Sequence, residues 1–354
     1  MFIRKLHITN YKNHEKKVFS FNEDTCAFIG LNGVGKTNIL DAIYMLCIGK
    51  SFFSSSDKNC IKQGESFFRL QIYMDQSEHK ELVVTAESSK RKKIVLDGIQ
   101  HVKNANHLGI FPVVVVSPND HVLITGSAEE RRKFIDQTLS QLSRDYLNAL
   151  LQYNASLKQR NALLKQAEEK GLDKNLLSIY NDSLHKNGVF IYQSRHRFFE
   201  NIKSFFKESF IALSAKDEGF TLSYTSHLAE KSLNQLLDET LKKDIILRRT
   251  TKGIHRDDVK FEMSGESLKD FGSQGQQKTV LLALKLAQFN FLKAQLNKVP
   301  LFIIDDIFDK LDMKRSQNLM NFLINQQGQV FISHTDKDMF QNISSAPVQV
   351  IDIE

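Results

Sequence analysis

Phosphate-binding chemistry is indicated by a glycine-rich stretch near the N-terminus, Phe28-Ile-Gly-Leu-Asn-Gly-Val-Gly-Lys-Thr37. Its spacing from Gly30 to Thr37 fits the pattern G-x-x-x-x-G-K-[ST]. Glycines let backbone N–H groups point inward at an anion, and a helix that begins at the loop adds its positive end. We therefore expect the loop to bind ATP through Gly30, Leu31, Asn32, Gly33, Val34, Gly35, Lys36 and Thr37.

The last two residues of the loop have separate expected roles. Lys36 would neutralise the β- and γ-phosphates, while the Thr37 hydroxyl would be a ligand of Mg²⁺. The apolar run Ala27-Phe-Ile29 precedes the loop as a buried strand should. Apolar residues follow at helical spacing, namely Ile39, Ala42, Ile43 and Leu46. The strand-loop-helix context that this motif requires is therefore present.

Two consecutive acids near the C-terminus fit the same chemistry. The apolar run Leu301-Phe-Ile-Ile304 delivers Asp305 and Asp306 at the end of a predicted buried strand. In that position Asp305 would bind Mg²⁺ together with Thr37. Paired buried carboxylates are costly without a cation, which favours a metal site over a structural role.

A second anion-binding device is predicted at Gly272-Ser-Gln-Gly-Gln-Gln277. This small, hydroxyl-bearing turn opens a helix whose apolar residues include Val280, Leu281 and Leu284. Backbone N–H groups at the start of a helix favour an anion.

Several basic segments leave two interpretations open. Lys12, beside the loop, would either reach the nucleotide or lie in a solvated turn. The tip of a predicted hairpin, Ser88-Ser-Lys-Arg-Lys-Lys93, would either bind a DNA backbone or face water. His255 would be a base or, as a structural residue, bond to Asp257 or Asp258. Clustered arginines bind phosphate bidentately. The candidate DNA contacts are Arg131, Arg132, Arg248, Arg249 and Lys252.

Composition sets limits on the class of protein. The 354 residues exceed what one hydrophobic core usually supports, so two or three lobes are expected. The net charge of +7 suits a phosphate-rich partner without requiring one. The three cysteines lack metal-site spacing and indicate reduced thiols. The charged N-terminus and the strand-length apolar runs favour a cytoplasmic protein without a membrane segment.

The elements that position these motifs are predicted from periodicity. Alternating strands occupy the first part of the chain, and Val113 to Val116 is a buried strand that ends at Pro118. From Ala128 to about Leu213 the period becomes helical, with a break at Gly171, which predicts a helical hairpin arm. Its expected packing seam comprises Leu147, Leu150, Asn154, Leu157, Asn161 and Leu164.

The order of these motifs resembles the head of ABC-type ATPases of the SMC group. Ser273-Gln-Gly-Gln276 resembles their signature motif, Lys310-Leu-Asp312 the D-loop, and His334 the switch histidine. Further stretches are similar to the RecF family of recombinational repair proteins. They are Asn10-Tyr-Lys-Asn13, Ser117-Pro-Asn-Asp120, Glu130-Arg-Arg-Lys-Phe-Ile-Asp136, Leu157-Lys-Gln-Arg-Asn-Ala-Leu-Leu164 and Gly253-Ile-His-Arg-Asp-Asp258.

The resemblance implies an α/β fold, an ABC/SMC-type P-loop ATPase head with an inserted helical arm lobe. It implies a first ATPase lobe at 1–120, a mainly helical arm at 121–250, and the second ATPase lobe at 251–354. ATP with Mg²⁺ would clamp two chains together, with Ser273, Gln274, Gly275 and Gln276 acting in trans and with Asp312 and His334 in the D-loop and switch positions. Asp306 would align the attacking water.

The family's partners are implied in the same way. The dimer would bind duplex DNA at gaps and single-strand/double-strand junctions and, with RecR and RecO, promote loading of RecA on single strands. Two rivals are the ATPase subunit of an ABC transporter and an ATPase-linked nuclease. The long helical insertion disfavours the first, and the second would need an extra acidic metal-binding domain that no spare stretch supplies.

Departures from the family pattern predict slow hydrolysis. Asp306 replaces the usual glutamate, and Asn119 stands where a glutamine is normal. Ile254 replaces a usual proline, Asp309 a usual serine, and His334 a small hydroxyl residue.

Overall fold

The computed structural model describes residues 2–75, 78–101, 107–214, 216 and 218–354. The chain divides into two compact units. Unit 1 comprises Met1–Asp120, Glu208–Lys216 and Thr279–Glu354, and unit 2 comprises His121–Lys207 and Asp217–Lys278.

A parallel sheet forms the centre of unit 1, with the strand order β14-β3-β13-β12-β8. Its three central strands are buried along their whole length, as is typical of parallel strands covered on both faces. The strands are β3 (Thr25–Ile29), β8 (Val113–Val116), β12 (Leu301–Asp305), β13 (Val330–His334) and β14 (Gln349–Asp352). This sheet confirms the predicted strands that carry the phosphate loop and the paired acids.

An antiparallel sheet of order β2-β1-β4-β5-β6-β7 forms the second layer of unit 1. Buried and more exposed residues alternate along β1, so one face of this sheet packs on the core. The strands are β1 (Phe2–Tyr11), β2 (His14–Ser20), β4 (Phe67–Asp75), β5 (Glu81–Glu87), β6 (Lys93–Leu96) and β7 (Ile99–His101). The basic segment at 88–93 lies at a hairpin between β5 and β6, as predicted.

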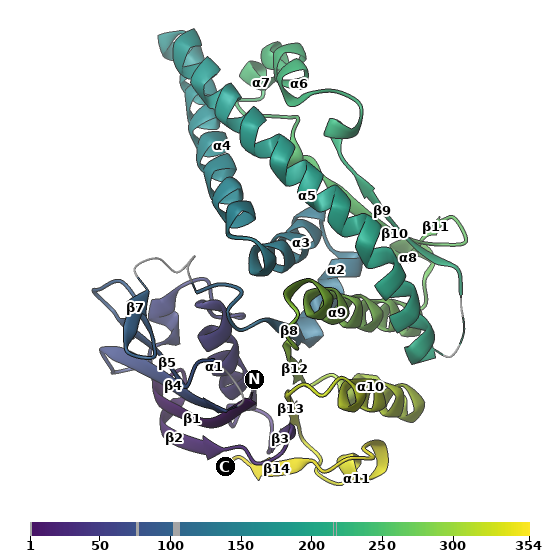
Figure 1. Cartoon of the computed structure of the whole chain (residues 1–354). Coiled ribbons are helices and arrows are strands. Elements are labelled where there is room, and N and C mark those ends of the chain that lie inside the picture. Colours follow the sequence, from purple (N-terminus) through teal and green to yellow (C-terminus); the bar gives the residue numbers. More distant parts are fainter. Residues whose placement is uncertain (1, 76–77, 102–106, 215, 217) are drawn as a thin grey trace. The chain divides into compact units, whose positions relative to one another are not determined.

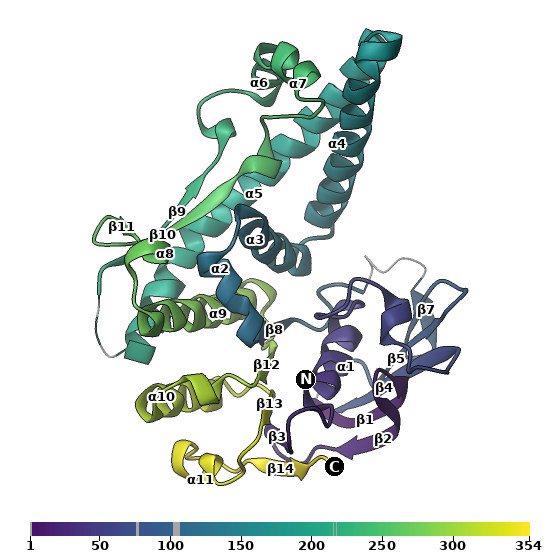
Figure 2. The same ribbon diagram turned by 180° about the vertical axis from the view of Figure 1, so that it is seen from behind.

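Helix α1 (Lys36–Ile48) packs against strands of both sheets. Figures 1 and 2 show it between the two layers. Almost every side chain of α1 is buried, because apolar residues surround the helix on all sides. The other helices of this unit are α10 (Met313–Asn325), α11 (Met339–Ile343), most of α9 (Gln274–Leu296) and the end of α5 (Lys174–Ser214). The phosphate loop therefore leads into the most deeply buried helix of the unit.

Two long helices dominate unit 2, α4 (Arg144–Lys170) and α5. They lie side by side in Figures 1 and 2, which confirms the predicted helical hairpin. The remaining helices of the unit are α2 (Val122–Thr125), α3 (Ala128–Leu142), α6 (Leu233–Glu239), α7 (Leu241–Ile246) and α8 (Leu268–Phe271). Strands β9 (Phe220–Thr225), β10 (Asp258–Met263) and β11 (Glu266–Ser267) form a small antiparallel sheet.

The predicted seam of α4 is wrong by one position. Of the predicted residues only Leu164 belongs to the buried stripe, and Asn154 is exposed. The buried stripe comprises Tyr146, Ala149, Tyr153, Ser156, Arg160 and Leu164. Four of these side chains carry polar atoms and form hydrogen bonds: Tyr146 with Asp136, Tyr153 with His255, Ser156 with Ser183, and Arg160 with Asp244. Hydrogen bonds offset their burial, so apolar periodicity did not locate the stripe.

Candidate functional site

Glycine is required where the phosphate loop meets α1. Gly35 has φ of 105°, in the left-handed region that side chains disfavour, and caps the helix. A Cβ atom there would lie 2.6 Å from Asn13 Oδ1 and 2.7 Å from His14 Nε2. Asn13 donates to the Val34 carbonyl, and Nε2 of His14 lies 3.1 Å from the Gly35 carbonyl. The β1–β2 turn therefore supports the loop from outside, a role that sequence reasoning missed.

The predicted phosphate-binding lysine is held against its own loop. Lys36 is buried, and its Nζ donates to the carbonyls of Gly30 at 2.6 Å and Leu31 at 3.0 Å. An ammonium group has three donors, so these two bonds orient Nζ and leave a third donor. Lys36 and Asn38 follow Gly35 at the start of α1, where Asn38 donates to Asn13 Oδ1. The lysine is thus positioned by the backbone of the loop it serves.

Thr37 and Asp305, far apart in the sequence, are in direct contact. Thr37 Oγ1 donates to Asp305 Oδ1 at 2.8 Å, and Ser333 Oγ donates to the same oxygen at 2.7 Å. Thr37 is the second residue of α1 and Asp305 ends β12, while Ser333 is paired with Asp305 in the parallel register. Ser333 was not singled out from the sequence, although its place before His334 at a strand end was visible.

This pair of oxygen ligands fits Mg²⁺. A hydroxyl and a carboxylate are donors that a hard cation prefers, and Asp305 is 5% exposed. Burial raises the pKa of Asp305, and hydrogen bonds from Ser333 and Thr37 oppose that rise. A buried carboxylate with a raised pKa gains from a neighbouring positive charge. Thr37 and Asp305 would therefore hold the cation.

The phosphate loop and the second acid, Asp306, line one pocket of about 160 Å³. Asp306 lies in its wall, with φ of 50° in the left-handed region, which is uncommon outside glycine. Its backbone N–H donates to Ser333 Oγ at 3.1 Å. The lining residues are Asn32, Gly33, Gly35, Lys36, Thr37, Asn38, Asp306 and Ser333. The structure thus brings together five of the predicted ATP-loop residues, Lys36 among them, and the second acid.

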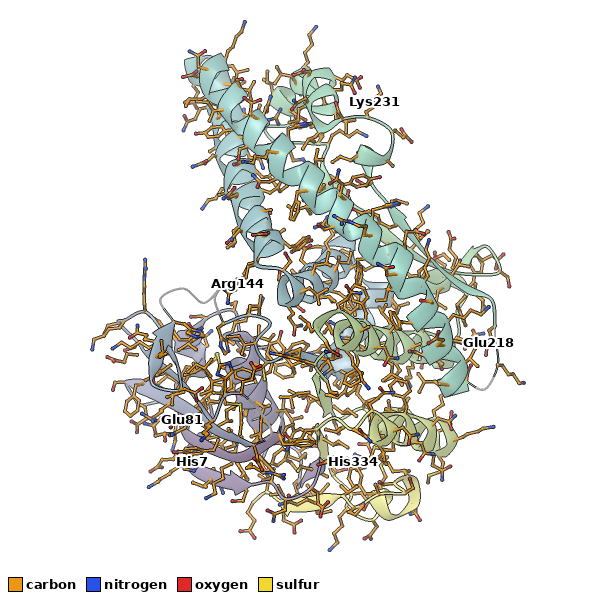
Figure 3. The ribbon with its side chains drawn as sticks, in the orientation of Figure 1. His7, Glu81, Arg144, Glu218, Lys231 and His334 are labelled. Atoms are coloured by element: carbon orange, nitrogen blue, oxygen red, sulfur yellow. The ribbon has the colours of Figure 1, made fainter. Side chains whose placement is uncertain are left out.

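The serine turn of unit 2 is a reciprocal helix cap. Ser273 Oγ accepts from the backbone N–H of Gln276, and Gln276 Oε1 accepts from the backbone N–H of Ser273. Gln276 also donates to Glu218, which Figure 3 labels. The cap orders the first turn of α9. The Ser273 hydroxyl keeps a proton with which it can donate to an anion.

The remaining predicted motif residues take different places. Asp312 caps α10, where its carboxylate accepts from Arg315 N. His334, labelled in Figure 3, ends β13 and is buried, with Nε2 3.6 Å from Asp309 Oδ1. Asn119 lies in a short 3₁₀ turn after β8 and is exposed.

The candidate DNA contacts differ in availability. Arg131 forms a bidentate pair with Asp258, and Arg132 donates to the Asp257 carbonyl. Arg248 pairs with Glu168 at the surface. These three guanidinium groups are engaged within unit 2, so Arg249 and Lys252 are the candidates that we retain. Among the residues of the basic hairpin, Lys90 pairs with Glu87 and Lys92 with Asp57.

Lys12 and His255 have structural partners in this structure. Neither interpretation of Lys12 describes its position, because its Nζ lies 2.6 Å from the buried carboxylate of Asp41 and joins the turn after β1 to α1. His255 is structural, but its partners are Tyr153 and the Thr250 carbonyl instead of the predicted aspartates. Because a carbonyl can only accept, Nε2 of His255 carries the proton and Nδ1 accepts from the Tyr153 hydroxyl.

Comparison with known proteins assigns the family. Residues 2–353 match the model of the RecF/RecN/SMC N terminal domain. A DNA replication and repair protein RecF of Flavobacterium johnsoniae is 41% identical over 356 residues, covering 100% of this chain and 99% of that protein. The chain belongs to the RecF family. The RecF of Cytophaga hutchinsonii is 39% identical and covers 96% of this chain and 90% of its own length.

Solved RecF structures share the fold. A recombination mediator protein RecF-ATPrS in the RecFOR pathway matches with a TM-score of 0.88 and 27% identity, covering 99% of this chain and 96% of that one. A corresponding RecF-ATP structure matches with a TM-score of 0.86 and 28% identity, covering 95% and 92%. An Smc head domain from Pyrococcus furiosus, 19% identical with a TM-score of 0.56, covers 100% and 94% and shares the fold alone.

These matches confirm the predicted α/β head of the SMC type with an inserted helical arm. Among the described residues, no helix has the length and apolar character that crossing a bilayer demands. The transporter-subunit alternative has no support from the family comparison, since the match to RecF relatives runs the whole length of the chain.

Proposed function

We propose that this RecF family member is an ATP-dependent DNA-binding protein of recombinational repair and replication, whose dimerisation is driven by ATP. The observation that carries the proposal is the contact between Thr37 Oγ1 and Asp305 Oδ1, at 2.8 Å, at the pocket that Thr37 and Lys36 line. That contact joins the phosphate loop to the acidic strand end, as nucleotide hydrolysis at a P-loop requires.

The residues at the pocket have different proposed roles in binding and hydrolysing ATP. Lys36 and the N–H groups of residues 30–37 would bind the phosphates, and the two carbonyl bonds of Lys36 orient its charge. Bound Mg²⁺, held by Thr37 and Asp305, would supply the positive charge that neutralises phosphate oxygens. Asp306 would align the attacking water from the pocket wall. The Asp306 side chain is shorter than that of the usual glutamate, so ATP hydrolysis would be slow. Slow hydrolysis would limit how long the ATP-bound dimer holds DNA.

The second anion-binding turn would act in trans. Ser273 and the backbone of Gly275 in one chain would meet the γ-phosphate held by Lys36 of the other chain. Support comes from the cap at Ser273, which orders the turn and leaves the hydroxyl proton available. ATP would then be part of the interface between two chains, and hydrolysis would loosen it. The head lobes in this arrangement are 1–120 and 251–354, with the arm at 121–250.

The proposed role in DNA repair rests on the similarity to RecF relatives. Solved RecF structures are described with ATP or ATPrS and are placed in the RecFOR pathway. By this relationship the dimer would bind duplex DNA at gaps and strand junctions, and RecR and RecO would join it to favour RecA loading. Arg249 and Lys252 are the proposed DNA contacts, and the net charge of +7 supports a polyanionic partner.

The test measures duplex DNA binding and molecular mass together, with and without ATP and Mg²⁺. We expect ATP to raise DNA affinity as the dimer forms, and the affinity to fall steeply with salt. Lys36→Ala should abolish both effects, because the charge that binds the phosphates is lost. Lys5→Ala, which removes an exposed lysine of β1, is the matched control and should behave as the wild type.

Two outcomes would contradict the proposal. ATP-driven dimerisation of the Lys36→Ala variant, measured by light scattering, would show that the predicted loop does not bind the nucleotide. A wild-type dimer that ignores DNA at low salt would leave the ATPase head intact but would refute the repair assignment.

A further inference from the structure

The antiparallel sheet of unit 1 has a second face that points away from the core. Apolar side chains of β1 and β4, such as Leu6 and Leu70, belong to the buried cluster that includes α1. Alternate residues of a strand point to opposite faces, so the side chains between them lie on the other side of the sheet, here called the outer face. Figure 3 labels His7 and Glu81 on this sheet. The outer face on β1 and β4 includes His7, Thr9, Arg69 and Tyr73.

A row of basic and hydroxyl side chains crosses five strands of the outer face. Thr9 is paired with Lys16 of β2 and with Arg69 of β4. Arg69 is paired with Thr85 of β5, and Thr85 with Lys93 of β6. Residues directly opposite each other on neighbouring strands share one face. Neighbouring strands lie about 4.8 Å apart, so the row is roughly 19 Å long and carries a cation on every second strand.

The three cations of the row are available to a ligand. Lys16, Arg69 and Lys93 are exposed, and in the described part of the chain none of them pairs with a carboxylate. Arg69 Nη2 donates to Gln71 Oε1 at 3.0 Å, which holds the guanidinium against the sheet and leaves its other N–H groups for an anion. Unpaired positive charge of this kind attracts a polyanion.

An aromatic pair lies on the same face, beside the row. The ring centroids of His7 and Tyr73 are 5.4 Å apart, and Tyr73 is 37% exposed. Nε2 of Gln71 donates to the Tyr73 hydroxyl at 2.6 Å and also to Glu81, the acid of this face. Because Gln71 bonds to both Tyr73 and Arg69, the ring and the guanidinium are ordered before any ligand arrives.

We propose that the outer face binds a single strand of DNA, with phosphates on Lys16, Arg69 and Lys93 and a base stacked on Tyr73. Exposed aromatic rings beside positive charge are typical of single-strand binding, because every unpaired base offers a π-face. Duplex DNA or an acidic protein would use the charges alone, since neither presents an unstacked base. The choice of DNA rests on the proposed function, whose duplex contacts are Arg249 and Lys252 of unit 2. The outer face is a further site, for the single-stranded side of a junction.

The first test measures the binding of a fluorescent thymidine oligomer of about 12 nucleotides by anisotropy, without ATP or Mg²⁺. This oligomer forms no duplex, so only single-strand contacts contribute. Tyr73→Leu should weaken binding about fivefold or more, because the stacking partner of a base is lost. Tyr73→Phe keeps the ring, is the matched control, and should bind as the wild type does.

The second test addresses the basic row with the double variant Lys16→Gln and Lys93→Gln. The slope of log affinity against log salt concentration should fall by about 0.7 for each phosphate contact that is lost. The matched control, Lys186→Gln with Lys298→Gln, removes two exposed lysines outside the sheet and makes the same change in net charge. It should keep the wild-type slope.

Several results would overturn the inference. They are failure of the wild type to bind the oligomer at low salt, and wild-type binding by both Tyr73→Leu and the Lys16/Lys93 variant. If Tyr73→Leu weakened a blunt-ended duplex equally, the face would not select a single strand, and tighter binding of a uridine oligomer would assign it to RNA. ATP is absent throughout, so these outcomes are separate from those of the ATP-driven dimer.

Discussion

Two glycines of the phosphate loop have the same backbone requirement and different surroundings. Gly33 and Gly35 have φ of 92° and 105°. A Cβ atom at Gly33 would meet no heavy atom within 4 Å, whereas one at Gly35 would collide with Asn13 and His14. The left-handed backbone penalises any side chain at both positions, but only Gly35 adds a steric cost.

Gly35→Ala should therefore destabilise the protein by about 1–3 kcal/mol more than Gly33→Ala. Thermal unfolding of the two variants checks this difference. Equal melting temperatures would show that Asn13 and His14 move aside without cost, and that the β1–β2 turn does not constrain the loop.

His255 makes unit 2 sensitive to acid. Burial lowers its pKa to about 4, while an unfolded histidine titrates near its usual 6.5. Between these values the unfolded chain binds the extra proton, so stability rises with pH across this window and falls as the pH drops from 6.5 toward 4.

Each such histidine changes the free energy of unfolding by up to about 1.4 kcal/mol per pH unit. Urea unfolding at pH 7 and pH 5 measures the slope. His255→Gln should flatten it. A variant with the wild-type slope would show that other groups, such as His107, whose pKa is also lowered to about 4, carry the whole dependence.

At the scale of elements, a buried ion pair joins α4 to α7, and a hydrogen bond from the same arginine reaches the segment that follows α7. Arg160 Nη1 donates to Asp244 Oδ2 at 2.8 Å and to Thr250 Oγ1 at 2.7 Å, and both charged side chains are fully buried. Asp244 also accepts from Thr251. Removing the arginine would leave the carboxylate buried and unpaired, the most costly state of such a pair.

Arg160→Ala should cost about 3–5 kcal/mol and increase hydrogen exchange along α4. Arg248→Ala is the matched control, since it breaks a pair with Glu168 in which both side chains are largely exposed, and it should change little. Similar exchange in the two variants would mean that the buried pair does not hold the arm together.

At the scale of the whole molecule, a comparison of two serine caps distinguishes an effect on dimer formation from an effect on helix stability. Ser273 caps α9, and Ser232 caps α6 with the same reciprocal bonds to a glutamine three residues later. Replacing either serine removes a comparable cap. Only Ser273 has a proposed role across the dimer.

Ser273→Arg should retain ATP affinity as a monomer and lose ATP-driven dimerisation, whereas Ser232→Arg should dimerise normally. Nucleotide titration and light scattering on both variants measure the two properties. Loss of ATP affinity in the monomeric Ser273→Arg variant would place the serine turn at the nucleotide of its own chain.

The sequence by itself determined the parts of this protein whose signal is local. The phosphate loop needs glycines, a lysine and a hydroxyl in consecutive positions, so its pattern was complete within Phe28–Thr37. The buried strands before Gly30 and Asp305, and the helical period of the arm, follow equally from nearby residues. The order of these motifs was sufficient for the family resemblance.

Only the tertiary structure decided which side chains are neighbours. The contact between Thr37 and Asp305, and the hydrogen bond from Asn13 to the Val34 carbonyl, join residues that are remote in sequence. The one-residue error in the α4 seam has the same origin, because Arg160 is buried through a partner that lies far along the chain. Burial of a polar side chain depends on that distant partner, and local periodicity carries no information about it.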